Sequence, residues 1–102
     1  MERFDNHTFV ICAYKESKYL EECIKSVINQ NVKSNILIST STPNTYIENL
    51  ANKYNLPLAI NTGKSGIGED WNFGVSQAKT SYVTVAHQDD IYNPEYLEEI
   101  VK

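Results

Sequence analysis

Apolar residues in this sequence follow two spacings, one typical of buried strands and one typical of helices. Four short runs are almost entirely apolar, which is the composition of strands buried on both faces of a sheet. These runs occupy residues 8–13, 35–39, 58–60 and 82–86. Between and after them, apolar residues recur every three or four positions and predict helices. The expected helices span about residues 17–30, 43–55 and 69–79, and a fourth starts at about residue 94.

The order of these elements predicts an α/β fold. Strands that alternate with helices at this spacing form parallel sheets whose two faces are covered by helices. We therefore expect a Rossmann-like three-layer α/β/α fold with a mostly parallel four-stranded sheet, in a single domain over residues 1–102. Ligands of such sheets bind beyond the carboxyl ends of the strands. Those ends are the segments 13–16, 39–42, 61–68 and 87–90.

Capping residues set the expected helix boundaries. Ser17 suits the N-cap of the first helix, and Thr42 precedes a proline that suits the first helical position. Asn93 precedes Pro94 in the same way. The helix that starts there stops after about two turns, so we expect the chain to be part of a longer protein. An apolar surface left for the remaining part would favour a homodimer of the isolated chain.

Composition and charge exclude several classes of protein. The net charge of −4 disfavours binding to the phosphate backbone of nucleic acids. No apolar run approaches the length needed to span a bilayer, and the N-terminus lacks the apolar region of a secretory signal. Cys12 and Cys23 form no metal-binding or disulfide pattern, so we expect buried, reduced thiols. We therefore expect a cytoplasmic protein, at most peripheral at the inner face of the membrane.

The segment after the fourth expected strand, residues 87–90, carries the strongest signal for chemistry. Asp89 and Asp90 are adjacent just beyond an apolar run. Mg²⁺ or Mn²⁺ that also binds substrate phosphates is held by one or two such carboxylates. His87 adds a nitrogen ligand, which Mn²⁺ tolerates better than Mg²⁺, or a donor to ribose. The alternative is a polar turn that merely ends the strand.

A glycine-rich segment precedes the third expected helix. Gly63, Gly66 and Gly68 surround Lys64, and such a segment is able to present backbone N–H groups and a helix N-terminus to a phosphate. The spacing matches neither a P-loop nor a dinucleotide fingerprint. A flexible turn therefore remains the alternative interpretation.

Three ring-bearing residues have simpler expected roles. Tyr14, after the first strand, is suited to stack on a nucleobase, although the chain has seven tyrosines. Trp71 is expected to anchor the core, with a role in the site as the alternative. His7 precedes the first expected strand and is expected to be solvated. No nucleophile elbow or catalytic triad pattern is present in the sequence.

Taken together, these features resemble the donor-binding half of family 2 glycosyltransferases of the GT-A fold. The resemblance runs from Phe9 to the C-terminus. It rests on an apolar first strand, a turn with Tyr14, the helix at residues 19–30 and a glycine-rich turn that leads to the Asn-Phe-Gly of residues 72–74. The D-x-D position of the family is occupied here by His87-Gln88-Asp89, with Asp90 directly behind it. The resulting HQDD sequence is similar to a form found in some members.

The resemblance implies transfer of a sugar from a nucleotide-diphospho-sugar to an acceptor hydroxyl, with inversion at the anomeric carbon. It implies that Tyr14 faces the base, that Asp89 binds the metal and that His87 takes the place of the first motif aspartate. It also implies a saccharide or lipid-linked acceptor, held by a half of the fold that lies beyond residue 102, as in bacterial polysaccharide biosynthesis. The expected ligands of Mn²⁺ or Mg²⁺ are Asp89, His87 and Asp90. The expected donor contacts are Ala13, Tyr14, Glu16, Ser39, Lys64, Asn72, His87 and Asp89.

Three departures from the family pattern narrow these implications. The Ser-Thr-Ser-Thr of residues 39–42 stands where members place an acidic residue that recognises base or ribose. Trp71 stands where members often carry arginine, which leaves Lys64 as a substitute cation. No residue is a candidate general base, so we expect the chain alone to be inactive. One alternative is a non-catalytic nucleotide- or partner-binding module. Another is a receiver-like domain, which needs an acidic pair after the first strand, where this sequence has Tyr14-Lys15-Glu16.

Overall fold

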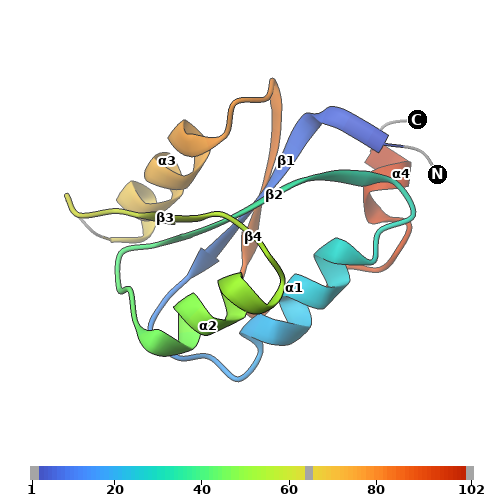
Figure 1. Cartoon of the computed structure of the whole chain (residues 1–102). Coiled ribbons are helices and arrows are strands. Elements are labelled where there is room, and N and C mark those ends of the chain that lie inside the picture. The colour runs from blue at the N-terminus through green and yellow to red at the C-terminus, as the bar shows by residue number, and fades with distance from the viewer. Residues whose placement is uncertain (1–2, 64–65, 101–102) are drawn as a thin grey trace.

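The computed structural model describes residues 3–63 and 66–100, and this part of the chain alternates strands with helices (Figure 1). The element order is the one predicted from the apolar pattern. In chain order the elements are β1 (Arg3–Ala13), α1 (Leu20–Ile28), β2 (Lys33–Thr40), α2 (Thr45–Lys53), β3 (Leu58–Ile60), α3 (Ile67–Gln77), β4 (Tyr82–His87) and α4 (Tyr96–Ile100).

The strands form one parallel sheet in the order β3-β2-β1-β4. The central strand is β1, in which Val10 is paired with Leu37 of β2 and with Val85 of β4. Helices α1 and α2 cover one face of the sheet, and α3 covers the other (Figure 1). The predicted Rossmann-like α/β/α fold is therefore confirmed.

The main core lies between the sheet and the helices α1, α2 and α4. Alternate residues of β1, Phe9 and Ile11, point into it and are almost completely buried. Full burial of one such side chain contributes about 1.5–3 kcal/mol to the free energy of unfolding. The core residues that come from helices recur every three or four positions, as the sequence predicts. They are Leu20, Cys23, Ile24 and Val27 of α1, Ile47, Leu50 and Ala51 of α2, and Leu97 of α4.

Helix α3 packs very close to the opposite face of the sheet. A Cβ atom at Gly74 would lie 2.7 Å from Val10 Cγ1 and 2.9 Å from Ser39 Oγ. Only a residue without a side chain allows the helix to come this near. Because α3 leads back to the start of β4, its N-terminal turn lies at the carboxyl ends of the strands (Figure 1).

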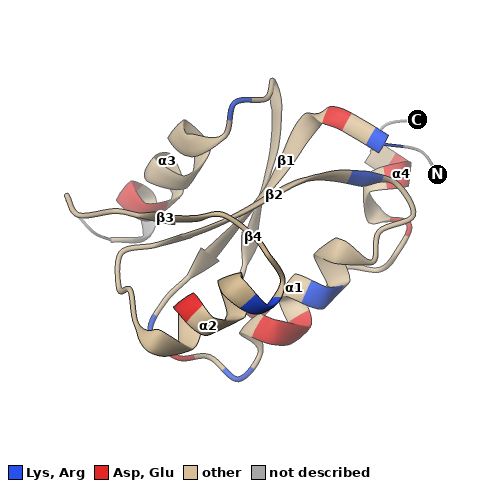
Figure 2. Cartoon of the chain, viewed as in Figure 1, with Lys and Arg blue, Asp and Glu red and all other residues tan. Residues whose placement is uncertain are grey.

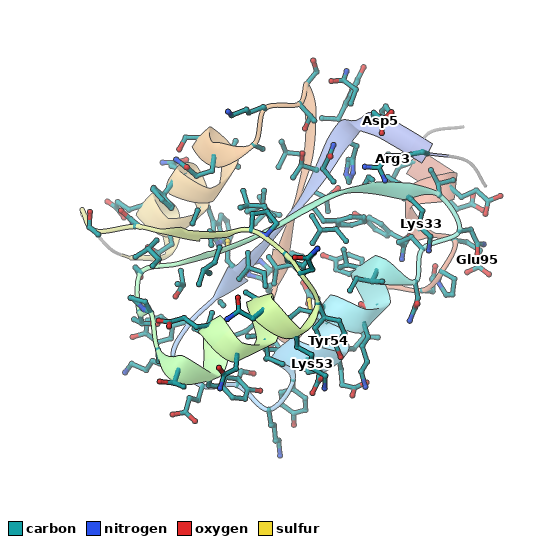
Figure 3. The ribbon with its side chains drawn as sticks, in the orientation of Figure 1. Arg3, Asp5, Lys33, Lys53, Tyr54 and Glu95 are labelled. Carbon is teal, nitrogen blue, oxygen red and sulfur yellow. The ribbon has the colours of Figure 1, made fainter. Side chains whose placement is uncertain are left out.

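Charged residues on the outer helices connect α1 with α2. Each of these two helices carries acidic residues in its first turn and a basic residue in its last turn (Figure 2). Glu21 of α1 accepts a hydrogen bond from Lys53 Nζ at 2.6 Å and from Tyr54 Oη at 2.5 Å. Figure 3 shows Lys53 and Tyr54 side by side at the end of α2. Because these groups are exposed, the contacts orient the helices more than they stabilise the fold.

The start of α2 differs from the prediction. Asn44, and not Thr42, is its N-cap, because Asn44 Oδ1 accepts a hydrogen bond from the Ile47 N–H at 2.8 Å. Thr42 Oγ1 instead accepts a hydrogen bond from the Lys15 N–H at 2.6 Å. The hydroxyl of Thr42 is therefore committed to a neighbouring loop. None of the helices in the described ranges is long and apolar enough to cross a bilayer.

The last helix and the first strand also have different starts from those expected. α4 begins at Tyr96, after a turn in which the Tyr96 N–H donates to Asn93 O at 3.1 Å, so Pro94 precedes the helix. β1 begins at Arg3, well before residue 8, and Arg3 forms an ion pair with Asp5 at the exposed start of the strand (Figure 3).

His7 is buried within β1, at 2% exposure, so the prediction of a solvated side chain is wrong. Its Nδ1 lies 3.0 Å from Ser34 Oγ and its Nε2 lies 2.8 Å from Thr84 Oγ1. The ring packs edge-on against Phe9, with ring centroids 4.8 Å apart. Burial lowers the pKa of His7, because the charged form loses its hydration.

Candidate functional site

A cleft of about 700 Å³ opens at the carboxyl ends of the strands. All four predicted segments contribute to it, so the expectation that these strand ends meet is confirmed. The lining residues are Cys12, Ala13, Tyr14, Ser17, Tyr19, Ser39, Thr40, Ser41, Thr42, Asn61, Gly66, Asp70, Trp71, Phe73, His87, Gln88 and Asp89.

The two aspartates after β4 have different surroundings. The Asp90 N–H donates to His87 O at 2.9 Å, and the His87 N–H donates to Asp90 Oδ2 at 3.3 Å. Asp90 thus closes the turn that ends the strand. Asp89 is exposed and lines the cleft, and among the described residues no hydrogen bond or ion pair engages its carboxylate. Asp89 therefore keeps its oxygen atoms available to a ligand.

The described residues offer a metal ion few ligands of their own. No three His, Cys, Asp or Glu side chains in the described ranges converge closely enough to hold a cation. Asp89 nevertheless fits the chemistry of Mg²⁺ or Mn²⁺, which are often held by one or two carboxylates while substrate phosphates and water complete the coordination shell. A cation bound at this edge would therefore need phosphate oxygens of a bound substrate to complete its coordination shell.

Trp71 lies at the cleft and is 39% exposed, so the prediction of a core anchor is wrong. It lies one helical turn before Gly74, the residue of α3 that packs against the sheet. There its ring lies 5.0 Å from the His87 ring, with the planes inclined by 59°. The contact joins the start of α3 to the end of β4. Tyr19 is also half exposed at the cleft.

Asp70, next to Trp71, brings a second carboxylate into the cleft. Its Oδ2 accepts a hydrogen bond from Ser41 Oγ at 3.0 Å, and its Oδ1 accepts one from Asn61 Nδ2 at 3.4 Å. These partners follow β2 and β3, so Asp70 lies over the strand ends where the sequence has no acidic residue. Sequence reasoning missed this placement, because nothing in the local pattern shows which way the first turn of α3 faces.

Gln88 ties the end of β4 to the end of β1. Its Oε1 accepts a hydrogen bond from the Tyr14 N–H at 2.8 Å, and its Nε2 donates to Tyr14 O at 3.1 Å. The Tyr14 side chain itself is 51% exposed at the cleft. Gln88, the second residue of the HQDD segment, was not singled out from sequence, since its partner lies far away along the chain.

Both cysteines are free thiols. Cys23 is buried, as predicted, and donates from Sγ to His87 O at 3.3 Å. Burial, followed by the charges of Asp90 and Asp89, raises the pKa of Cys23 to about 12. Cys12 is only partly buried and lines the cleft, and burial raises its pKa as well. Neither thiol is poised to act as a nucleophile, because both favour the protonated form.

The remaining predicted site residues fall into three groups. Ala13 and Ser39 line the cleft beside Tyr14. Glu16 and Asn72 are exposed and lie outside the lining. Lys64 lies outside the described residues, while Gly66 of the same glycine-rich segment lines the cleft at the start of α3.

The fold and the cleft define a Rossmann-like α/β domain with a polar site at the carboxyl edge of a parallel sheet. The family described as Glycosyl transferase family 2 matches residues 8–102, which is nearly the whole chain. The chain therefore belongs to glycosyl transferase family 2.

One relative carries a name that agrees with this assignment, and one solved structure shares the fold. An uncharacterized glycosyltransferase of Haemophilus influenzae is 28% identical over 99 residues, covering 90% of this chain and 30% of the relative. The crystal structure of S. aureus TarS 1-349 superimposes with a TM-score of 0.79 at 18% identity, covering 99% of this chain and 31% of that one. The similarity to TarS is a similarity of fold. The chain spans a little under a third of the length of each.

Proposed function

We propose that this chain is the donor-binding part of an inverting glycosyltransferase and holds a nucleotide-diphospho-sugar together with Mn²⁺ or Mg²⁺. The observation that carries the proposal is the cleft, in which an exposed tyrosine and an uncommitted aspartate lie at the same edge of the sheet in a family 2 chain. Parallel α/β sheets bind nucleotides at this edge.

The two sides of the cleft suit the two ends of such a donor. Tyr14 offers an exposed ring to the base, and Asp70 offers carboxylate oxygens to hydroxyl groups of the nucleoside or sugar. Asp89 would hold the divalent cation against the diphosphate, with His87 as a further ligand or donor. When bound, this cation would stabilise the negative charge that develops on the nucleotide leaving group.

The transfer also needs a general base for the acceptor hydroxyl. We assign this role to none of the described residues, and we propose that the acceptor, a saccharide or a lipid-linked sugar, is bound by a part of the protein outside this chain. On this proposal the chain binds the donor and does not transfer its sugar alone.

Nucleotide titration tests the proposal. Trp71 is the single tryptophan of the chain and lies at the cleft, so its fluorescence reports binding directly. UDP or dTDP should bind in the presence of Mn²⁺, and Asp89→Asn should weaken this binding by about tenfold or more, because even residues that support metal ligands contribute that much to metal affinity. Glu48→Gln, an exposed carboxylate on α2 outside the cleft, is the control and should bind like the wild type. Equal binding by the Asp89→Asn variant would count against the proposal.

A further inference from the structure

The turn at Tyr14 and Lys15 is held by side chains from both neighbouring loops. On the β4 side, Gln88 bonds both the N–H and the C=O of Tyr14, at 2.8 and 3.1 Å. On the β2 side, Thr42 Oγ1 accepts from the Lys15 N–H at 2.6 Å, and Asn44 Nδ2 donates to Lys15 O at 3.0 Å. All four backbone polar groups of the two residues are thus bonded to side chains.

This arrangement fixes a backbone conformation that is unfavourable by itself. Lys15 has a φ of 54°, in the left-handed region that residues with a side chain rarely adopt. Such a conformation persists only when the surroundings determine it. The four hydrogen bonds do so, and they leave the ring of Tyr14 exposed on the cleft. The turn therefore presents this ring in a fixed position.

Gln88 acts where the sheet itself can no longer hold the turn. The ladder between β1 and β4 ends at the pair formed by Cys12 and His87. Beyond it, the chain turns away, because the Asp90 N–H bonds back to His87 O. The amide of Gln88 supplies one acceptor and one donor, as a further backbone pair would. These two hydrogen bonds keep Tyr14 attached to the end of β4, and the Asp89 carboxylate remains free to face a ligand.

We propose that Gln88 is a positioning residue, which holds Tyr14 in the orientation that binds the nucleobase of the donor. The inference rests on the proposed function and assigns a role to Gln88, an HQDD residue that has none in it. Gln88 acts through Tyr14 and not by contact with the diphosphate, so its effect on binding depends on the Tyr14 ring.

A double-mutant cycle measures this dependence. Gln88→Met keeps the length of the side chain and removes both hydrogen bonds. It should weaken binding of UDP or dTDP with Mn²⁺ by about tenfold, which is within the range of interaction energies between residues in contact. Tyr14→Ala should also weaken binding, because it removes the stacking surface. In the Tyr14→Ala background, Gln88→Met should change the affinity less than about twofold. Gln77→Met, the same change on the exposed side of α3, is the matched control and should bind like the wild type.

A second variant addresses the same turn if Gln88→Met fails to fold. Thr42→Val removes the acceptor of the Lys15 N–H with little change of shape, and its effect should likewise vanish in the Tyr14→Ala background. Losses of equal size with and without the Tyr14 ring, or no loss at all in folded variants, would overturn the inference alone. A wild-type chain that binds neither nucleotide would overturn the proposed function and the inference with it.

Discussion

At the scale of single residues, burial decides which groups of this domain carry charge. His7 is enclosed between two hydroxyl groups, and burial lowers its pKa. Cys23 lies below the turn after β4, and burial raises its pKa to about 12. Both groups are therefore neutral near pH 7. Asp89 and Asp70 instead line the cleft.

His7 makes the stability of the domain depend on pH. Its pKa is lower in the folded chain than its value of about 6.5 in the unfolded chain, so the unfolded chain binds more protons in between. The contribution of His7 is present above pH 6.5 and is lost as the pH falls below it. Urea unfolding between pH 8 and pH 5 should show this decline.

A variant with an uncharged side chain isolates the contribution of His7. His7→Gln should be less stable than the wild type at pH 8, because it alters two buried hydrogen bonds. Its stability should fall less steeply between pH 7 and pH 5. Parallel pH profiles for the two proteins would assign the acid sensitivity to other groups.

At the scale of elements, the close packing of α3 against the sheet positions one wall of the cleft. Gly74→Ala places a Cβ atom within 3 Å of Val10 and Ser39, so the helix must move outward. We expect a loss of about 1–3 kcal/mol in the free energy of unfolding, as is usual for overpacking. The shift should also change the fluorescence of Trp71, one turn earlier in the same helix. Chemical unfolding and emission spectra measure the two effects.

Gly68→Ala is the matched control in the same helix. Apart from the adjoining residues and the backbone of the helix itself, no atom of the described residues lies within 4 Å of a Cβ at this position. Alanine should therefore leave the fold unstrained and raise its stability by about 0.4–1 kcal/mol. If the two alanine variants were equally stable, close packing at Gly74 would not be what positions α3.

At the scale of the whole molecule, the features predicted well are those that local pattern encodes. The parallel sheet follows from short apolar runs that alternate with helical periodicity, and the meeting of the four strand ends follows from the sheet. The buried face of α1 was predicted for the same reason, because its apolar residues follow the helical repeat. The turn after β4 at residues 87–90 follows from the same pattern, because it comes directly after an apolar strand.

The features that were missed depend on partners far apart in sequence. His7 is buried because Ser34 and Thr84 satisfy its ring, and neither can be linked to it from spacing. Trp71 lies at the cleft because Gly74 lets α3 pack closely against the sheet. This packing depends on contacts with two strands. Asp70 faces Ser41 for the same reason. Local sequence specifies the elements, whereas side chains at their ends are oriented by tertiary contacts.

The central claim is that this cleft holds a nucleoside diphosphate with its metal. A crystal structure of the chain grown with UDP or dTDP and Mn²⁺ tests it most directly, since anomalous scattering identifies the metal. We predict a Mn²⁺ peak beside the Asp89 carboxylate, the diphosphate next to it, and the base against the Tyr14 ring. Nucleotide bound away from the strand ends, or in the cleft with the metal remote from Asp89, would contradict the account.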